Sequence, residues 1–263
     1  MTRIGKLFEK LQAEKRCGMI VYLTAGDPTP EATPGFVAAL ERGGADLIEL
    51  GVPFSDPIAD GPVIQKAGDR ALKAGTTVAK VLEIAAAIRK TSEIPILLFT
   101  YLNPVIKYGF EKLAADAKAV GIDGCLLTDA SVEEAEAYVA PMRAAGLDTV
   151  FLAAPTSSAR RLKLVAEYSS GFVYMVSRTG ITGEQQTLSD SALPLIERMR
   201  EQTKLPLAMG FGISKPEHVA ELKHHVEAVV IGSAIVRQIE EDSTQLEAFL
   251  RRLAAPLHTA AIS

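Results

Sequence analysis

LIELGVPFSDPIADGPVIQ, residues 47–65, begins as a buried strand and continues into a loop that carries two carboxylates. Side chains alternate across a strand, so Ile48 and Leu50 share one face while Leu47 and Glu49 share the other. Apart from Glu49 both faces are apolar, which is typical of a strand covered on both sides by helices. The stretch therefore predicts a parallel strand of an α/β protein with one acidic side chain pointing inward near its end.

Seven further apolar runs occur along the chain, with helix-like segments between them that close on Gly, Pro or a short polar turn. The eight predicted strands are residues 19–24, 45–51, 94–101, 123–129, 148–154, 171–177, 205–212 and 227–233. Eight strand–helix units in a chain of this length predict a (β/α)8 TIM barrel. A doubly wound open sheet is the alternative, but LTAGDPTPE lacks the G-x-G-x-x-G turn that usually follows its first strand.

The ends and the composition of the chain agree with one barrel. Ile4, Leu7, Phe8 and Leu11 recur at helical spacing and predict an extra N-terminal helix. No Pro/Ser-rich linker divides the chain, so we expect a single domain over residues 1–263. The 263 residues are 48% hydrophobic and 23% charged with a net charge of −4, which fits one soluble globular unit with a large core.

The charge pattern, the N-terminal sequence and the cysteines indicate which partners and which cellular compartment to expect. The 28 basic residues are scattered among 32 acidic ones without a basic block, so nucleic acid is not an expected partner. The N-terminus has no uninterrupted apolar signal core and no segment reads as membrane-spanning, so we expect a cytoplasmic protein. Cys17 and Cys125 lie outside any CxxC or His/Cys cluster and are expected to be buried thiols.

The barrel prediction indicates where the acidic residues lie, because active sites in this fold form at the carboxyl ends of the strands. Glu49 would sit in an apolar barrel mouth, where burial raises its pKa towards the range useful for proton transfer. Asp60, in the loop after the same strand, could reach the same cavity, although a solvated loop residue is the alternative. Asp56, in FSDP, reads more simply as an Asx turn before a proline.

Glycine-rich strand ends indicate an anion site. MGFGIS follows the seventh predicted strand and IGSAIV the eighth, the usual position at which a barrel binds phosphate through backbone N–H groups. RTGITGE after the sixth strand adds further glycines in a polar loop, and ordinary tight turns are the alternative reading. The residues concerned are Gly183, Gly212, Gly232 and Ser233.

Two absences and a group of aromatic residues narrow the chemistry. The sixth strand has no lysine for a Schiff base, and the four histidines lie in helical or tail segments, so we expect acid–base chemistry without an imine or a metal. Aromatic residues at the strand ends could line a flat slot for an aromatic ring. They are Tyr22, Phe99, Tyr101, Tyr174 and Phe211.

The stretch at 47–65 resembles the signature segment of the tryptophan synthase alpha chains, and YLNPVIKYG, YMVSRTGITG and MGFGIS are similar to other blocks of that family. The resemblance covers essentially the whole chain. It implies a retro-aldol lyase that splits indole-3-glycerol phosphate into indole and D-glyceraldehyde 3-phosphate, without a cofactor of its own. The indole would feed a beta subunit in L-tryptophan biosynthesis.

The family's site residues map onto positions already singled out. The resemblance implies that Glu49 moves a proton between the glycerol hydroxyl and indole C3, and that Asp60 holds the indole N–H as positive charge develops. Tyr174 matches the active-site tyrosine, and Phe211 with Phe99 would contact the indole. The glycines at 183, 212 and 232 and Ser233 match phosphate-binding positions. Residues 178–190 match a lid, in which Thr182 is similar to the residue that helps to order the loop of Asp60.

The resemblance also implies a partner. PFSDP and YLNPVIKYG are similar to segments that face a beta chain, which carries pyridoxal phosphate, in an alpha2-beta2 heterotetramer. Pro53, Asp56, Asn103 and Pro104 are then interface residues. Three alternatives stay open: another phosphate-binding barrel enzyme, a non-catalytic subunit that keeps the fold, and a stand-alone lyase that releases free indole.

Overall fold

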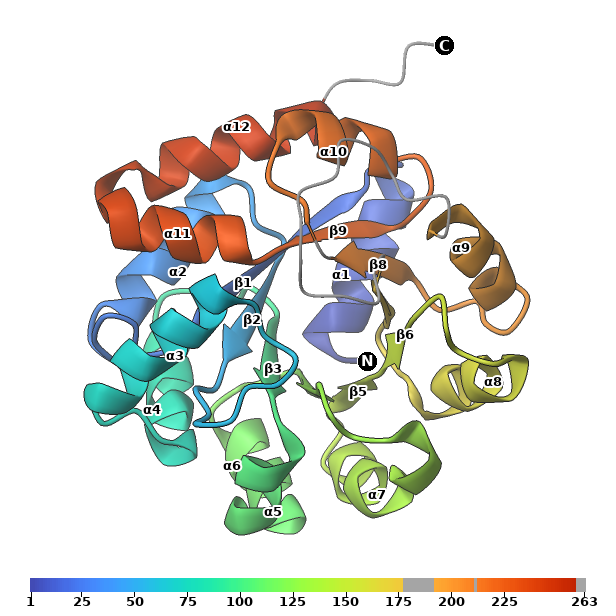
Figure 1. Cartoon of the computed structure of the whole chain (residues 1–263), viewed down its shortest axis with the longest axis horizontal. Coiled ribbons are helices and arrows are strands. Elements are labelled where there is room, and N and C mark those ends of the chain that lie inside the picture. Colours follow the sequence, from blue (N-terminus) through green and yellow to red (C-terminus); the bar gives the residue numbers. More distant parts are fainter. Residues whose placement is uncertain (177–191, 211, 259–263) are drawn as a thin grey trace.

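The computed structural model describes residues 1–176, 192–210 and 212–258, and it forms a barrel of parallel strands inside a ring of helices (Figure 1). Every strand pairing is parallel, and the sheet order is β5-β4-β3-β2-β1-β9-β8-β7-β6. The predicted TIM barrel is therefore confirmed. The strands are β1 (Gly18–Thr24), β2 (Leu47–Gly51), β3 (Ile96–Thr100), β4 (Gly124–Leu127), β5 (Asp148–Val150), β6 (Leu152–Ala153), β7 (Val173–Val176), β8 (Leu207–Gly210) and β9 (Ala228–Ile231).

The described residues contain nine strands instead of eight because the predicted fifth strand, 148–154, divides at Phe151. Its first half, β5, pairs with β4, and its second half, β6, pairs with β7. The two ends of the sheet order are thus one continuous piece of chain, which closes the barrel. The N–H of Tyr174 donates to the carbonyl of Phe151 at 3.1 Å across this junction.

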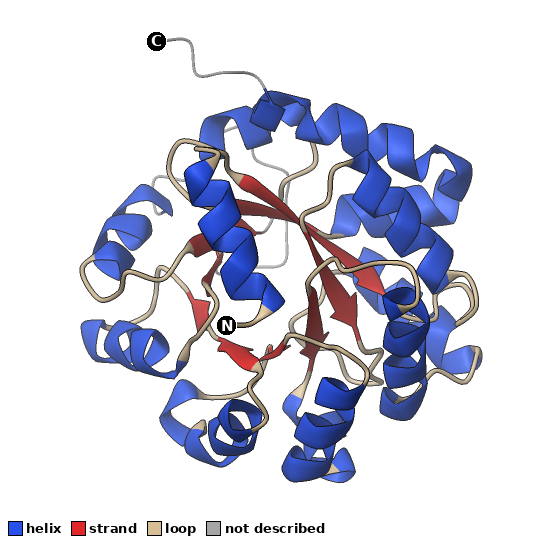
Figure 2. Cartoon of the chain, turned by 180° about the vertical axis from the view of Figure 1, so that it is seen from behind, coloured by secondary structure: helices blue, strands red, loops and turns tan. Residues whose placement is uncertain are grey.

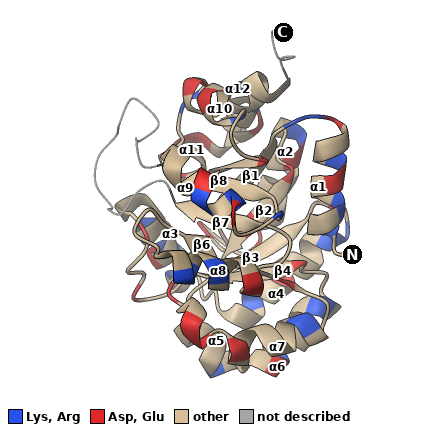
Figure 3. Cartoon of the chain, turned by 90° about the vertical axis from the view of Figure 1, so that its right-hand side faces the viewer, with Lys and Arg blue, Asp and Glu red and all other residues tan. Residues whose placement is uncertain are grey.

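The helices lie outside the strands and one more lies beneath them. In the ring are α2 (Thr33–Gly43), α3 (Pro62–Lys73), α4 (Val78–Arg89), α5 (Leu102–Tyr108), α6 (Phe110–Ala119), α7 (Glu136–Ala144), α8 (Ala159–Tyr168), α9 (Ala192–Arg200), α10 (Pro216–Leu222), α11 (Ser233–Asp242) and α12 (Leu246–His258), with two 3-10 turns, Val132–Glu134 and Ser243–Gln245. None of the described helices is both long and apolar enough to cross a membrane. In the side view of Figure 3, basic and acidic residues are interspersed over the helices.

The predicted N-terminal helix is α1 (Arg3–Ala13), which lies across the amino-terminal end of the barrel (Figure 2). Its apolar face, Ile4, Phe8 and Leu11, is buried against the residues that fill the barrel interior. The rings of Phe8 and Phe172 are 5.7 Å apart. The helix therefore closes one end of the barrel and leaves the carboxyl ends of the strands as the mouth.

Strand alternation divides the core as expected. Leu47 belongs to the cluster that fills the barrel interior, whereas Ile48 and Leu50 belong to the larger cluster between strands and helices. The period of two then directs Glu49 inward, above Leu47 and towards the mouth. The expected orientation of Glu49 is confirmed by this packing.

Acidic side chains and one serine fasten the strands at the closed end. Asp46, Asp123 and Glu227 each lie immediately before a strand, and each accepts the backbone N–H near the start of the strand before it, at 2.7–2.9 Å. The Ser170 hydroxyl accepts the N–H of Thr149 in the same way. These four contacts therefore fasten alternate neighbours at their N-terminal ends: β1 to β2, β3 to β4, β5 to the segment before β7, and β8 to β9.

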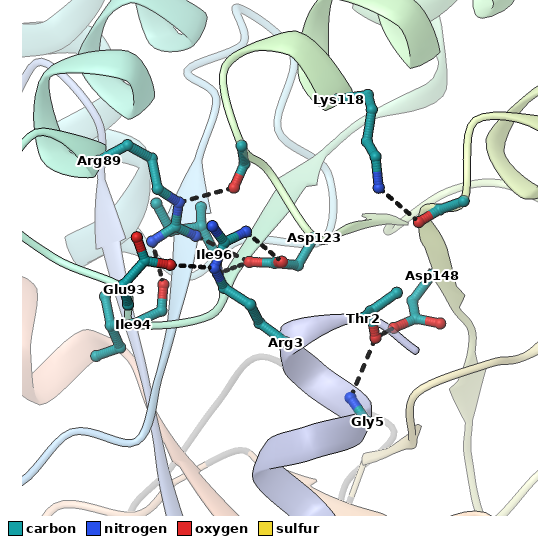
Figure 4. A network of polar contacts seen from close by, with 12 residues as sticks. Thr2, Arg3, Gly5, Arg89, Glu93, Ile94, Ile96, Lys118, Asp123 and Asp148 are labelled. Carbon is teal, nitrogen blue, oxygen red and sulfur yellow. Dashed lines mark hydrogen bonds and ion pairs between the residues drawn. The ribbon is translucent and has the colours of Figure 1, made fainter.

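Asp123 has the most partner residues among these groups (Figure 4). Its carboxylate accepts the N–H of Ile96 and pairs with Arg89 at 2.8 Å and with Arg3 at 3.2 Å. Arg3 comes from α1 and also pairs with the exposed Glu93 at 2.7 Å. One buried carboxylate thus joins the N-terminal helix, α4 and two strands.

Candidate active site

Glu49 lies on β2 inside the barrel, between Tyr22 of β1 and Leu97 of β3 in the strand register. The side chain is 1% exposed, and among the described residues its Oε1 atom has no hydrogen-bond partner. Burial without a compensating cation or donor disfavours the ionised form and raises the pKa of Glu49 to about 8. The carboxyl group is therefore protonated at neutral pH, with an oxygen free to exchange a proton.

Asp60 lies in the loop after β2, two residues before α3 begins. Its N–H donates to the carbonyl of Pro57 at 3.0 Å, and its own carbonyl accepts from the Gln65 side chain at 2.8 Å. Burial raises the pKa of the Asp60 carboxyl to about 6, against the opposing effect of a hydrogen bond with Tyr101. At neutral pH Asp60 is therefore ionised while Glu49 is protonated, which gives the two carboxyl groups different roles.

Tyr101 fastens the loop of Asp60 to the next strand. Its hydroxyl accepts the N–H of Ala59 at 3.0 Å, and its ring lies 5.2 Å from that of Phe54. Burial, followed by the charge of Asp60, raises the pKa of the Tyr101 hydroxyl. The backbone before Asp60 is thus held by a side chain at the start of α5.

Three aromatic rings form a row across the barrel interior. Tyr22 and Phe99 meet edge to face with centroids 5.2 Å apart, and Phe99 lies 6.3 Å from Tyr174. Burial is the main cause that raises the pKa of both tyrosine hydroxyls. Nearby negative charge raises these pKa values further, mainly that of Asp60 at Tyr22 and that of Glu49 at Tyr174. Three of the aromatic residues singled out in the sequence therefore lie together, close to both carboxyl groups.

Two glycines that the sequence analysis did not single out make room for these tyrosines. A Cβ atom on Gly51 would lie 2.3 Å from the hydroxyl of Tyr22, and one on Gly210 would lie 2.2 Å from the hydroxyl of Tyr174. Each glycine occupies an inward position at the end of its strand. The sequence does contain a signal for them: Gly51 lies two residues after Glu49 and Gly210 two residues after Ala208, so each glycine faces inward like the residue before it on that face.

The predicted phosphate positions are described in part. Gly232 ends the segment after β9, and its carbonyl accepts the N–H groups of Ile235 and Val236 at the start of α11. A Cβ on Gly232 would lie 3.5 Å from the Cβ of Tyr22, so the start of α11 adjoins the aromatic row. Gly212 has φ +83, with no described atom near the position of a Cβ. Thr182, Gly183, Phe211 and the predicted lid, 178–190, lie outside the described residues.

The segments expected to meet a partner lie side by side at the mouth. Asp56 and Asn103 are exposed, Pro104 is half-buried, and Pro53 is buried. The structure adds two residues that the sequence analysis missed, Ile58 and Ile106, which are 77% and 57% exposed. Ile58 lies in the loop after β2 and Ile106 in helix α5, and large apolar side chains left in solvent on adjacent segments are typical of a protein interface.

Comparisons with known proteins agree with this geometry. The family profile described as tryptophan synthase alpha chain matches residues 8–261. The curated tryptophan synthase alpha chain of Solibacter usitatus is 70% identical over 259 residues, covering 96% of this chain and 97% of the relative. That of Geotalea uraniireducens is 46% identical and covers 92% of this chain and 90% of the relative.

Solved structures give the same result. A chain of Mycobacterium tuberculosis tryptophan synthase superposes with a TM-score of 0.92 at 34% identity, covering 98% of this chain and 99% of that one. A protein from Aquifex aeolicus superposes with a TM-score of 0.91 at 36% identity, covering 98% and 100%. The likeness therefore spans the whole barrel.

Proposed function

Because the chain belongs to the tryptophan synthase alpha chain family, we propose that Glu49 is the acid–base catalyst of its reaction and that Asp60 stabilises the positive charge that develops on the indole. The chain is the lyase component of tryptophan synthase. The reaction is a retro-aldol cleavage of indole-3-glycerol phosphate to indole and D-glyceraldehyde 3-phosphate. The observation that carries the proposal is the buried Glu49 carboxyl at the mouth of the barrel, one oxygen of which has no partner in the part of the chain that the structure describes.

Glu49 begins the reaction as an acid. Its raised pKa keeps it protonated at neutral pH, so it can deliver a proton to indole C3, which becomes tetrahedral. The resulting carboxylate then takes the proton of the glycerol hydroxyl next to C3. The carbon–carbon bond breaks, its electron pair returns to the indole ring, and the hydroxyl carbon becomes the aldehyde, so that the carboxyl ends protonated as it began.

Asp60 supports the intermediate electrostatically. Protonation at C3 leaves positive charge on the ring nitrogen, and an ionised carboxylate that accepts the indole N–H lowers the free energy of that state. A pKa of about 6 leaves Asp60 ionised when the pH is near 7. Tyr174 and Phe99 would bound the indole ring, and Gly212, Gly232 and Ser233, with Gly183, would hold the phosphate through backbone N–H groups and a hydroxyl.

We also propose a partner that covers the mouth. The exposed Ile58 and Ile106, together with Asp56 and Asn103, fit the surface that would meet a beta chain in an alpha2-beta2 heterotetramer. Pyridoxal phosphate would then belong to the beta chain, and this chain would work without a cofactor of its own. The two buried free thiols, Cys17 and Cys125, support a cytoplasmic location.

The first experiment measures release of glyceraldehyde 3-phosphate from indole-3-glycerol phosphate by the purified chain, alone and with a beta chain. We expect cleavage that rises with the partner, and a loss of about 1,000-fold or more in Glu49→Gln and Asp60→Asn. Glu93→Gln, at the closed end, is the matched control and should retain full activity. Normal turnover in Glu49→Gln would remove Glu49 from its role, and equal turnover with and without the partner would contradict the coupling.

A further inference from the structure

Three elements that carry different parts of the site meet at one junction: β1, α3 and α11 (Figure 1). Tyr22 of β1, Ala67 of α3 and Val236 of α11 form a buried apolar cluster. Helix α3 begins two residues after Asp60, and helix α11 begins at Ser233. The packing of α3 against α11 therefore sets the distance between the acid–base end of the site and the predicted phosphate end.

An ionic cluster lies at the outer side of the same junction. Arg70 of α3 binds Asp27, in the loop after β1, through two hydrogen bonds of 2.7 and 2.8 Å. Its third nitrogen pairs with Glu240 of α11 at 2.8 Å. The Asp27 side chain is only 4% exposed, and a planar guanidinium that binds a carboxylate through two nitrogens fixes orientation as well as distance.

The helical spacing links the two layers. Arg70 lies three residues beyond Ala67, and Glu240 lies four residues beyond Val236, so each charged residue shares a helix face with its apolar neighbour. One helix pair thus carries an apolar contact near the substrate slot and an ionic contact farther out. Two contacts along one helix pair resist a change in angle, which a single contact does not.

We propose that Arg70 is a positioning residue that holds α11 at a fixed distance from the loop of Asp60. The inference rests on the proposed function, in which the indole ring binds near Asp60 and the phosphate binds at Gly232 and Ser233. A wrong distance between the two ends impairs the reaction of a substrate that spans both of them, whereas it does not affect the binding of a ligand that occupies only one end. Small misplacements of reacting groups lower rates strongly, by up to about 100-fold for a shift of 1 Å.

The test uses two variants: Glu240→Gln, which removes only the ion pair between Arg70 and α11, and Arg70→Lys, which loses the two-nitrogen geometry. For each variant, kcat/KM is measured with the whole substrate, indole-3-glycerol phosphate. Calorimetry gives the dissociation constants of two half ligands, indole for one end of the site and inorganic phosphate for the other. We expect kcat/KM to fall about tenfold or more, while each half ligand keeps its dissociation constant within about twofold.

Arg16 provides matched controls at the closed end. It binds Asp46 through two nitrogens at 2.7 and 2.8 Å and also pairs with the half-exposed Glu14 at 3.4 Å. Arg16→Lys and Glu14→Gln therefore repeat the same chemical changes far from the mouth, and they should leave kcat/KM unchanged. Thermal unfolding of all four variants measures any loss of stability separately.

The outcomes separate the two proposals. Unchanged kcat/KM in Glu240→Gln and Arg70→Lys overturns the role of Arg70. The role is also overturned if both half ligands bind more weakly in proportion to the loss of kcat/KM, because a general loss of structure then explains the lower activity. If Asp60→Asn keeps full activity or wild-type protein cleaves no substrate, the proposed function fails and this inference fails with it. Loss of kcat/KM with both half ligands bound normally supports the spacing role.

Discussion

The hydroxyl of Tyr174 on β7 lies over Gly210 on the neighbouring strand β8, so closely that a Cβ there would come within 2.2 Å of it. The ring atoms beside the hydroxyl would be 2.8 and 3.0 Å from that Cβ. Tyr22 of β1 and Gly51 of the neighbouring strand β2 show the same relationship, with a Cβ distance of 2.3 Å. Both tyrosines lie close to the carboxyl groups of Glu49 and Asp60, so the two glycines make room for the rings beside these groups.

Gly210→Ala should therefore displace Tyr174 and lower kcat/KM by about 100-fold, since the methyl group occupies the space of the hydroxyl. No described atom lies within 4 Å of a Cβ position on Gly35 in α2, so Gly35→Ala is the matched control and should leave activity unchanged. Steady-state kinetics with indole-3-glycerol phosphate checks both. Full activity in Gly210→Ala would show that the ring of Tyr174 can move without consequence.

The pH dependence of kcat/KM should be bell-shaped. Activity needs an ionised Asp60, which is lost as the pH falls through about 6, and a protonated Glu49, which is lost as the pH rises through about 8. The substrate phosphate also titrates near pH 6, so the residual activity of Asp60→Asn identifies the source of the acidic limb. If that limb persists in the variant, it belongs to the substrate and not to Asp60.

Glu49 should also make stability depend on pH. Its pKa is raised from 4.5 to about 8 in the folded chain, so between these pH values the folded state holds a proton that the unfolded state has released. The contribution is complete below about pH 4.5 and is lost as the pH rises through 8, by an amount on the order of 4 kcal/mol. Glu49→Gln does not titrate, so its free energy of unfolding relative to wild type should increase from pH 5 to pH 8. Urea unfolding at both pH values measures this difference, and a constant difference would contradict the raised pKa.

The closed end of the barrel should control stability and not catalysis. Asp123→Asn removes a buried carboxylate that serves Arg3, Arg89 and the N–H of Ile96, and it should lower the free energy of unfolding by about 3 kcal/mol. Glu93 pairs only with Arg3 among the described residues and its side chain is 79% exposed, so Glu93→Gln should change stability by less than about 0.5 kcal/mol. Both variants should retain wild-type kcat/KM where they are folded. A large loss of activity in folded Asp123→Asn would show that the two ends are coupled.

Much of the site was predictable because it depends on local rules. The apolar runs give the strands, the period of two directs Glu49 inward, and the barrel brings the ends of the strands to one mouth. The same reasoning anticipated that Tyr22, Phe99 and Tyr174 lie together, and the structure confirms this in the row of rings. The fifth strand was predicted as continuous, but it divides at Phe151, because its two halves pair with different neighbours where the sheet closes.

The sequence by itself determined which elements form, which faces they bury and which residues reach the mouth of the barrel, because these follow from spacing along the chain. Only the tertiary structure decided which residues from distant elements touch: the glycines beneath the two tyrosines, and the ionic cluster of Arg70 with Asp27 and Glu240. It also decided that, among the described residues, one oxygen of Glu49 has no hydrogen-bond partner. The contacts of the ionic cluster join residues up to 170 positions apart. Their geometry arises when strand register and helix packing close the barrel, and no periodicity in the chain encodes it locally.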